Sequence, residues 1–485
     1  MGQLDDRVAV ADLLARSLSA VDRQDWTALL ACFAPGARTV YRGAEGAIED
    51  AIPNMARDLE ATVASTHLLT TLVAEVDGTH ARSIAYALVR GRRADPAVDA
   101  VLGVVYTNRF ERLDGDGSSS GTRCPPGSSV RSSSATGEPR RSWRTSRMSL
   151  PTRNLGGTGI EITRVGIGSW ALGGSDWTFG WGEQDDEDSI AAIRHAVDQG
   201  VNWIDTAPVY GLGHSEEVVA RALDGVPERD RPHVFTKCGM VWDDSNRSEP
   251  PRLSATPETI RRDLEGSLRR LRTERIDLYQ MHWPSDDGTA VEDYWSALLD
   301  LKAQGKVRAV GLSNHGIDRL EQAEDVGHVD CLQPPFSAIN RRSAAEITWC
   351  LDHGTGVIVY SPLQSGLLTG SFSAARAACL APDDWRSKDE EFRGERLTRN
   401  LALADALRPI ADDRQVPVAA VAVAWTLAWP GVSGAIVGVR RPDQVESWIP
   451  AATLELTHRE LDRIAAAIDA TGAGEGPSRP RRLVC

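Results

Sequence analysis

Short apolar strands alternate with amphipathic helices along the larger, C-terminal part of the chain, and this alternation limits its fold more than any other feature. Runs rich in Val, Ile and Leu predict eight strands, at 165–168, 202–205, 234–237, 276–281, 307–312, 331–333, 356–360 and 434–437. Apolar residues at helical spacing predict helices between them, at 188–199, 215–223, 257–271, 291–304, 317–325, 344–353 and 399–413, and one after Pro442. Eight such βα units close a barrel. We therefore predict an α/β fold, a (β/α)8 TIM barrel, over residues 149–472, followed by a flexible tail at 473–485.

Polar residues stand where most of the predicted strands end. In chain order, these strand-end positions are Asp205, Lys237, His282, Ser313, Asn314, Gln333, Ser361 and then Gly438 with Arg440. The active site of a (β/α)8 barrel lies at the carboxyl ends of its strands, because the loops that follow the strands gather there. A set of polar residues at these ends, in strands that are otherwise apolar, therefore indicates a functional site.

One group of these residues suits proton transfer to a carbonyl oxygen. Tyr210 follows Asp205 by five residues, and Lys237 and His282 end the next two long strands. A phenol with a pKa of about 10 is a poor acid or base at neutral pH, so we expect Lys237 to shift it and Asp205 to hold the lysine. His282 would share the proton or orient the carbonyl. Such a group fits reduction of an aldehyde or ketone, for which a cofactor must supply the hydride.

These residues lie in motifs that resemble the aldo-keto reductase family. The motifs are WIDTAPVYG, FTKCG, MHWP, GLSNH, YSPLQSGLLTG and VGVRRPDQVE, in the family's order from about residue 150 to residue 466. The resemblance implies a catalytic tetrad of Asp205, Tyr210, Lys237 and His282, with Tyr210 as the general acid. It also implies an oxidoreductase that reduces a small carbonyl compound to an alcohol with NADPH.

The same resemblance implies a set of cofactor-binding residues. They are Ser313, Asn314 and Gln333 for the nicotinamide carboxamide, Tyr360 for the ring, Ser361 and Leu363 for the pyrophosphate, and Gly438, Arg440 and Gln444 for the adenosine end. Arg440 stands where the family grips a 2′-phosphate, and a guanidinium suits a phosphate. The chain departs from the family at Ser371, where a lysine is common, and at Ser447 and Trp448, where a Glu-Asn pair is common.

One other interpretation of the barrel remains open, and a second is rejected by its sequence context. The barrel could bind a nicotinamide cofactor as a sensor or regulatory subunit with negligible turnover, although an intact tetrad argues against this. The run Gly166-x-Gly168-x-x-Ala171 matches a dinucleotide-binding fingerprint, but that fingerprint must open a helix, and residues 172–182 are typical of a loop.

Two loops at the expected mouth of the barrel carry aromatic residues. The first contains Trp170, Trp177, Phe179 and Trp181, and the second, between Gly370 and Thr398, contains Trp385. The first either walls the substrate pocket or packs around the rim. The second is a substrate gate or a simple cover.

A segment rich in Ser, Arg, Gly and Pro, residues 118–148, divides the chain. Such a composition buries too little apolar surface to fold, so we predict a disordered linker. Because MSLPTRNLGGTG at its end resembles the start of a protein, the linker is either an ordinary flexible connection or the junction of two fused coding units.

Residues 1–117 are predicted to form a small α+β domain. Helical spacing at 7–18, 26–33 and 48–63 precedes strand-like sequence at 68–76, 82–91 and 101–113. The segments VDRQDWTALLACFAPGARTVYRG and STHLLT resemble the cone-shaped SnoaL-like polyketide-cyclase group. The resemblance implies a pocket with Asp22, Tyr41 and His67. The domain is then an isomerase, cyclase or dehydratase in a bifunctional protein, or a non-catalytic module that binds a ligand or self-associates.

Composition and charge restrict the partners of the protein. The net charge of −14 disfavours nucleic acid and anionic lipid, and no stretch approaches the roughly 18 apolar residues that span a bilayer. The seven cysteines form no C-x-x-C pair and the histidines show no metal-ligand spacing, so we expect no metal. We expect a cytoplasmic protein with a small-molecule substrate.

Overall fold

The computed structural model describes the chain in two separate parts. In the N-terminal part it describes the backbone of residues 38–41, 44–47, 62–77, 80–93 and 99–111. In the C-terminal part it describes residues 150–480 except 176, 248, 286, 382 and 383. Contacts divide the chain into two units, Met1–Arg141 and Ser142–Cys485, and the division falls inside the predicted linker.

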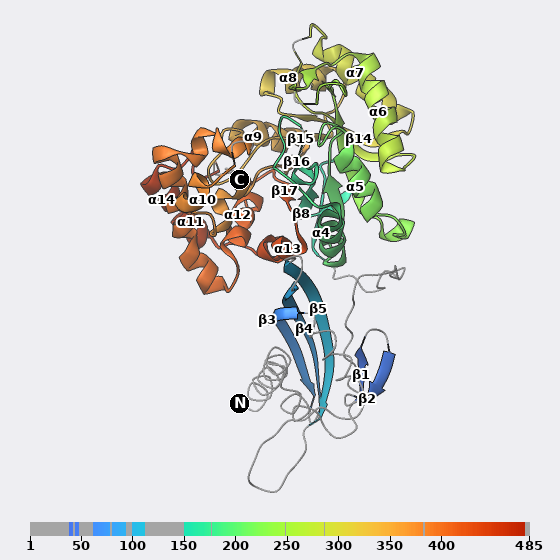
Figure 1. Cartoon of the computed structure of the whole chain (residues 1–485). Helices are drawn as coiled ribbons and strands as arrows, with labels where there is room; N and C mark the ends of the chain where they lie inside the picture. The colour runs from blue at the N-terminus through green and yellow to red at the C-terminus, as the bar shows by residue number, and fades with distance from the viewer. Residues whose placement is uncertain are drawn as a thin grey trace. The chain divides into compact units, whose positions relative to one another are not determined.

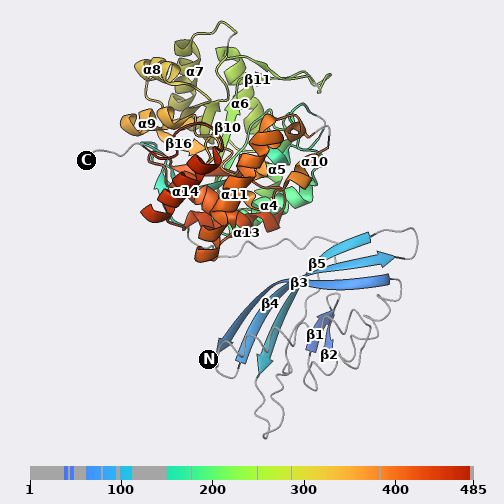
Figure 2. The ribbon, with the colours of Figure 1, turned by 90° about the vertical axis from the view of Figure 1, so that its left-hand side faces the viewer.

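The N-terminal unit contains an antiparallel sheet of three long strands. The strands are β3 (Thr62–Asp77), β4 (His80–Arg93) and β5 (Asp99–Glu111), in the order β3-β4-β5, and Figure 2 shows their strong curvature. A separate hairpin pairs β1 (Arg38–Tyr41) with β2 (Ala44–Ala47). The three expected strands are therefore present. β3 and β4 are longer than predicted, β5 has the predicted length but begins two residues earlier, and the hairpin was not predicted. The helices expected at 7–18 and 26–33 lie outside the described residues, as does the helix expected at 48–63 except for its last two residues. Those two residues belong to β3, so the expected helix is wrong at its end.

Eight parallel strands form a closed barrel in the C-terminal unit (Figure 1). They are β8 (Val165–Gly168), β9 (Trp203–Asp205), β10 (His233–Cys238), β13 (Ile276–Met281), β14 (Val307–Ser313), β15 (Cys331–Gln333), β16 (Gly356–Val359) and β17 (Gly434–Gly438). Each strand pairs with the next in the chain, and β17 pairs with β8 to close the barrel. The predicted (β/α)8 fold is confirmed, strand by strand.

Helices surround the barrel on its outer side. They are α4 (Asp186–Asp198), α5 (His214–Ala222), α6 (Pro257–Leu271), α7 (Val291–Ala303), α8 (Ile317–Val326), α9 (Ala344–His353), α10 (Ala374–Ala378), α11 (Gly394–Arg414), α12 (Val418–Leu427), α13 (Pro442–Trp448) and α14 (His458–Thr471). Local signals fix several ends. Thr256 caps α6 before Pro257, and Thr457 with Glu460 forms a capping box at α14.

The lower interior of the barrel is filled by large apolar side chains. Trp203, Phe235, Leu278, Ile358 and Ile436 meet there, and the short hairpin of β6 (Thr152–Asn154) and β7 (Glu161–Thr163) adds further apolar residues. Gly166 makes room for the core, because a Cβ at that position would lie 2.1 Å from the Trp203 ring. The first glycine of the dinucleotide-like fingerprint therefore serves packing, and only a single turn at Trp170–Leu172 follows the strand.

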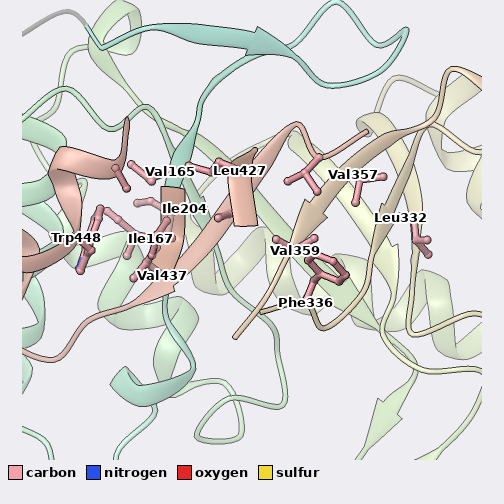
Figure 3. Close-up of a cluster of buried hydrophobic side chains, with 14 of the residues drawn as sticks. Val165, Ile167, Ile204, Leu332, Phe336, Val357, Val359, Leu427, Val437 and Trp448 are labelled. Atoms are coloured by element: carbon pink, nitrogen blue, oxygen red, sulfur yellow. The ribbon is translucent and has the colours of Figure 1, made fainter. Parts of the chain in front are cut away.

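A second apolar layer lies between the strands and the helices. Figure 3 shows part of it, where Val165, Ile167 and Val437 from the strands lie near Trp448 of α13. Each fully buried side chain of this kind contributes roughly 1.5–3 kcal/mol to folding. The layer holds each strand in position and so fixes where its last residue lies.

The packed part of the C-terminal unit extends several residues further along the chain than predicted. Arg341 N donates to Glu475 O at 2.8 Å, and Glu475 N donates to Ile339 O at 3.0 Å. The expected flexible tail at 473–485 is therefore wrong for its first residues, because this backbone pairing holds them. Residues 481–485 lie outside the described residues.

Candidate active site

The four residues of the predicted tetrad meet at the carboxyl end of the barrel. Asp205 ends β9, Lys237 lies near the end of β10, His282 directly follows β13, and Tyr210 lies in the turn between β9 and α5. Since side chains alternate along a strand, Asp205 and Lys237 point to the same interior as Trp203 and Phe235, one layer higher. The strand register thus brings together residues that are far apart in the sequence.

Lys237 is the centre of this group. Its Nζ donates to Asp205 Oδ1 at 2.6 Å, to the Thr206 carbonyl at 3.0 Å and to Tyr210 Oη at 3.4 Å. The side chains of Lys237 and Asp205 are 0% and 3% exposed. The ammonium is therefore shielded from water, where its effect on the Tyr210 phenol is strongest.

The backbone around Tyr210 fixes the position of its ring. Gly211 has a φ of 63°, and a Cβ there would lie 2.2 Å from the Gly173 carbonyl oxygen. Only glycine fits this close approach. The Tyr210 ring meets His282 edge-on with centroids 5.7 Å apart, so the phenol and the imidazole line the same space.

Burial sets the protonation states of the site. It raises the pKa of Tyr210 well above its ordinary value, with a further rise from Asp205, and it lowers the pKa of Lys237, which Asp205 and Glu216 oppose. Burial, and then Lys237, lowers the pKa of His282 well below its ordinary value. Lys237 was expected to shift the Tyr210 pKa, but the net shift at this site is upward, because burial and Asp205 both raise this pKa. At neutral pH Tyr210 carries its proton and His282 is neutral.

The predicted carboxamide-binding residues form one hydrogen-bonded group beside the tetrad. Asn314 adopts a left-handed φ of 63°, and its Nδ2 donates to the His282 carbonyl at 3.0 Å and to Ser313 Oγ at 3.1 Å. Ser313 Oγ donates to the Gln333 carbonyl at 3.0 Å. Gln333 Nε2 donates to Asp205 Oδ2 at 2.8 Å. Fixed amide groups next to His282 are the donors and acceptors that a carboxamide requires.

Tyr360 and the loop after it lie next to this group. The Tyr360 phenol donates to Asn314 Oδ1 at 2.8 Å. Ser361, Gln364 and Ser365 all have left-handed φ, between 44° and 56°, on either side of Leu363. Each such residue costs about 1–3 kcal/mol, and such strain concentrates at ligand-binding loops. The conformation of this loop therefore fits a ligand-binding role.

Arg440 follows β17 and is already hydrogen-bonded in this structure. Its guanidinium donates to Gln184 Oε1 at 2.6 Å, to the Trp181 carbonyl at 3.3 Å and to the Glu183 carbonyl. Gln444 Oε1 accepts from the Arg440 backbone at 2.7 Å, and Gly438, at the end of β17, is exposed. The loop at 181–184 thus lies against the residue expected to bind the cofactor phosphate.

The positions that depart from the family have local roles. Ser371 is near Thr369, with the two hydroxyl oxygens 3.1 Å apart, and Ser447 Oγ donates to the Gln444 carbonyl at 2.7 Å. Trp448 is buried in the layer behind β8 and β17. Because its ring belongs to the core, Trp448 does not line an adenine pocket.

Three tryptophans from the two aromatic loops pack above Tyr210. Trp170 is stacked near Tyr210 with centroids 6.4 Å apart, and Trp385 stacks on Trp170 at 5.7 Å. Trp181 meets both Trp170 and Trp385 edge-on. Both loops therefore contribute to one aromatic cluster beside Tyr210, and its role as a wall of the substrate pocket stays a prediction. Trp177 packs lower, against Ala207 and Val209.

Two residues of this region were missed by the sequence analysis. Gln280 of β13 is fully buried, and its Oε1 accepts from Gln333 Nε2 at 3.3 Å. Gln184 binds Arg440 through its side chain and also donates to the Arg440 carbonyl at 2.9 Å. The signal for Gln280 was its place two residues before His282, where the interior face of a strand should be apolar. For Gln184 no local signal exists.

The pocket predicted in the N-terminal domain is only partly described. The backbone of Tyr41 ends β1 and that of His67 lies in β3, opposite Val89 of β4. Asp22 lies outside the described residues, as do the side chains of Tyr41 and His67. The pocket stays a prediction.

The described part of the chain contains neither a membrane-spanning helix nor a cluster of metal ligands. No helix there is long and apolar enough to cross a membrane. Among the same residues, no three His, Cys, Asp or Glu side chains gather as a metal site would require.

The chain forms a barrel of eight βα units with the four predicted residues at its mouth, and comparison with known proteins identifies its family. Residues 164–469 match the model of the aldo/keto reductase family, and residues 2–116 match that of the SnoaL-like domain. The chain therefore belongs to the aldo-keto reductase family, whose members are oxidoreductases that use nicotinamide cofactors, and it carries a SnoaL-like domain before the barrel.

Similar proteins cover the barrel almost completely. The chain is 35% identical to aldo-keto reductase YhdN of Bacillus subtilis over 61% of this chain and 86% of the relative. It is 33% identical to an NADH-specific methylglyoxal reductase of Escherichia coli over 62% of this chain and 94% of that protein. Among solved structures, a glycerol dehydrogenase of Gluconobacter oxydans is 34% identical with a TM-score of 0.61, over 69% of this chain and 99% of that one.

Proposed function

We propose that the barrel reduces an aldehyde or ketone to an alcohol with NADPH, and that Tyr210 is the general acid. The observation that carries this proposal is the placement of the Tyr210 phenol 3.4 Å from Lys237 Nζ, beside a neutral His282. The phenol holds its proton at neutral pH, as an acid must, and the adjacent ammonium stabilises the phenolate that remains after the proton leaves.

Each member of the tetrad has a distinct part in this proposal. Tyr210 donates its proton to the carbonyl oxygen of the substrate as negative charge develops there. Lys237 stabilises the phenolate, and Asp205 holds Lys237 through the 2.6 Å ion pair. Neutral His282, whose ring meets that of Tyr210 edge-on, orients the same carbonyl oxygen. Because these groups are already in place, the site need not rearrange as charge develops on the substrate.

The chain's residues fit a nicotinamide cofactor, which when bound supplies the hydride. Ser313, Asn314 and Gln333 would hold its carboxamide, and Tyr360 would lie against its ring. Ser361 and Leu363 would bind the pyrophosphate, and Gly438, Arg440 and Gln444 the adenosine end. The support is the group of fixed amides beside His282 and the strained loop after Tyr360.

The preference for NADPH rests on Arg440. A guanidinium offers several donors to a phosphate, which NADH lacks. In the present structure those donors are hydrogen-bonded to the loop at 181–184. The phosphate of NADPH must therefore replace these hydrogen bonds. The protein of Escherichia coli described above is NADH-specific, which makes the choice of cofactor a question for direct measurement.

A fluorescence titration of the full-length protein with NADPH, and separately with NADH, tests the proposal without a known substrate. Trp170, Trp181 and Trp385 lie next to the site and provide the signal. We expect quenching by both cofactors, with tighter binding of NADPH. Binding of neither would contradict the proposed function, and tighter binding of NADH would contradict the role of Arg440.

A further inference from the structure

We propose that Gln280 is a positioning residue that fixes which way the amide of Gln333 faces. This inference rests on the proposed function, in which Gln333 binds the nicotinamide carboxamide. Gln280 and Gln333 project from β13 and β15 into the barrel interior, and they are 0% and 2% exposed. Both amides are almost completely buried, so in this structure the neighbouring protein groups set their orientation.

The donors and acceptors determine the orientation of both amides. The Asp205 carboxylate, paired with Lys237, only accepts hydrogen bonds, so it favours the nitrogen of Gln333, which faces it at 2.8 Å. That nitrogen has a second hydrogen, and Gln280 Oε1 accepts it at 3.3 Å. If the Gln280 amide were turned over, two NH2 groups would face each other. Gln280 therefore keeps the Gln333 nitrogen turned toward Asp205.

This arrangement leaves the oxygen of Gln333 as the remaining polar atom of its amide. An amide oxygen accepts a hydrogen bond from an NH2 group, and the nicotinamide carboxamide carries such a group. Gln280 thus selects a cofactor ring that donates at this position. The selection depends on orientation, because a Gln333 amide turned over would present an NH2 group instead.

The cost of Gln280 supports a functional role. Its Nε2 is buried and has no hydrogen-bond partner, which is unfavourable for the folded state. A Leu or Met of similar volume would fill the same space without an unpaired donor. Folding alone would therefore not favour glutamine at this position.

The test compares the binding of NADPH and of its reduced acetylpyridine analogue, in which a methyl ketone replaces the carboxamide. The analogue cannot donate to Gln333. We expect the wild-type protein to bind it about fivefold more weakly than NADPH, as the loss of one hydrogen bond predicts. In Gln280→Met this ratio should fall toward one, while Tm stays unchanged or rises. A ratio near one in the wild type, or an unchanged ratio in Gln280→Met, would overturn the inference.

Two further variants separate positioning from structure. Gln280→Glu keeps an oxygen for the Gln333 nitrogen and should keep the wild-type ratio of affinities. A ratio near one in this variant would overturn the inference, and this test holds even if Gln280→Met does not fold. Thr355→Val is the matched control, because Thr355 is also buried with an unpaired oxygen but precedes β16 at the opposite end of the barrel. Its ratio should match the wild type. Failure of the wild type to bind either nucleotide would overturn the proposed function, and this inference with it.

Discussion

Lys237 and Asp205 form an ion pair of 2.6 Å that is almost completely buried in the barrel. Taking two charges out of water costs several kcal/mol per ion, and the attraction within the pair offsets this only when the geometry is good. A pair of apolar residues would often be at least as stable. The pair is therefore best explained by what it does for Tyr210, which Lys237 also contacts.

Removing one partner of this pair should destabilise the protein strongly. We expect Asp205→Asn and Lys237→Met each to lower the free energy of unfolding of the barrel by about 3–5 kcal/mol, because each leaves a buried charge unpaired. The double variant should lose less than the sum. Denaturant unfolding followed by tryptophan fluorescence measures this. Lys306→Met, which breaks an exposed pair with Glu265, is the control and should cost less than about 1 kcal/mol. Additive losses in the double variant would refute the coupling.

Reductase activity should be insensitive to pH around neutrality. The pKa of His282 is lowered below, and that of Tyr210 raised above, their ordinary values, so neither group changes its protonation between about pH 6.5 and pH 8.5. Proton donation requires the protonated phenol, and activity should therefore fall only at higher pH, where Tyr210 or Lys237 loses its proton. Steady-state kcat/KM across this range is the measurement. A fall in kcat/KM as the pH drops below 7 would show that His282 titrates in the reaction.

The loop at 181–184 should influence the choice of cofactor. Gln184 Oε1 accepts a hydrogen bond from Arg440 Nε. Because Gln184→Ala removes this acceptor, the Arg440 donor becomes available to a phosphate, and NADPH binding should tighten by about two- to tenfold. NADH binding should change little. Titration of both cofactors gives the ratio, and Gln304→Ala, at the exposed end of α7, serves as the control. Equal changes for NADPH and NADH would mean that Arg440 does not contact the phosphate.

The contact between Gly211 and Gly173 should be essential for the position of Tyr210. Gly211→Ala combines an unfavourable φ with a Cβ 2.2 Å from a carbonyl oxygen, and we expect a loss of about 2 kcal/mol or more in unfolding free energy. Activity should fall further than stability explains. Gly157→Ala, at an exposed position with nothing near its Cβ, should change neither. Wild-type activity in Gly211→Ala would show that the turn does not position Tyr210.

The strands of the barrel could be predicted because each is a short apolar run bounded by polar residues. The same patterns predicted α6 and α9 with their observed ends. Helix α12 was missed because it is buried on all sides and so shows no amphipathic period. The hairpin of β11 (Met240–Val241) and β12 (Arg252–Leu253) has too few residues for a pattern.

The candidate site was predictable where it depends on strand ends. Asp205, Lys237, Gln333 and His282 were found because parallel strands bring their carboxyl ends to one face. The rise in the Tyr210 pKa was not predicted, because it depends on burial, which the sequence does not give.

Contacts with a rim loop could not be predicted from the sequence. Gln184 and Arg440 are 256 residues apart, and neither lies in a pattern that points to the other. Such a contact follows from the packing of loops over the closed barrel.

Aldehyde-dependent oxidation of NADPH by the full-length protein, compared between wild type and Tyr210→Phe, tests the central claim most directly. The variant keeps the ring and its contacts with Trp170 and His282 but lacks the acid. We predict measurable turnover in the wild type and a loss of about 10²- to 10⁴-fold in Tyr210→Phe, with an unchanged Kd for NADPH. Turnover in Tyr210→Phe within a few fold of the wild type would contradict the assignment of Tyr210 as the general acid.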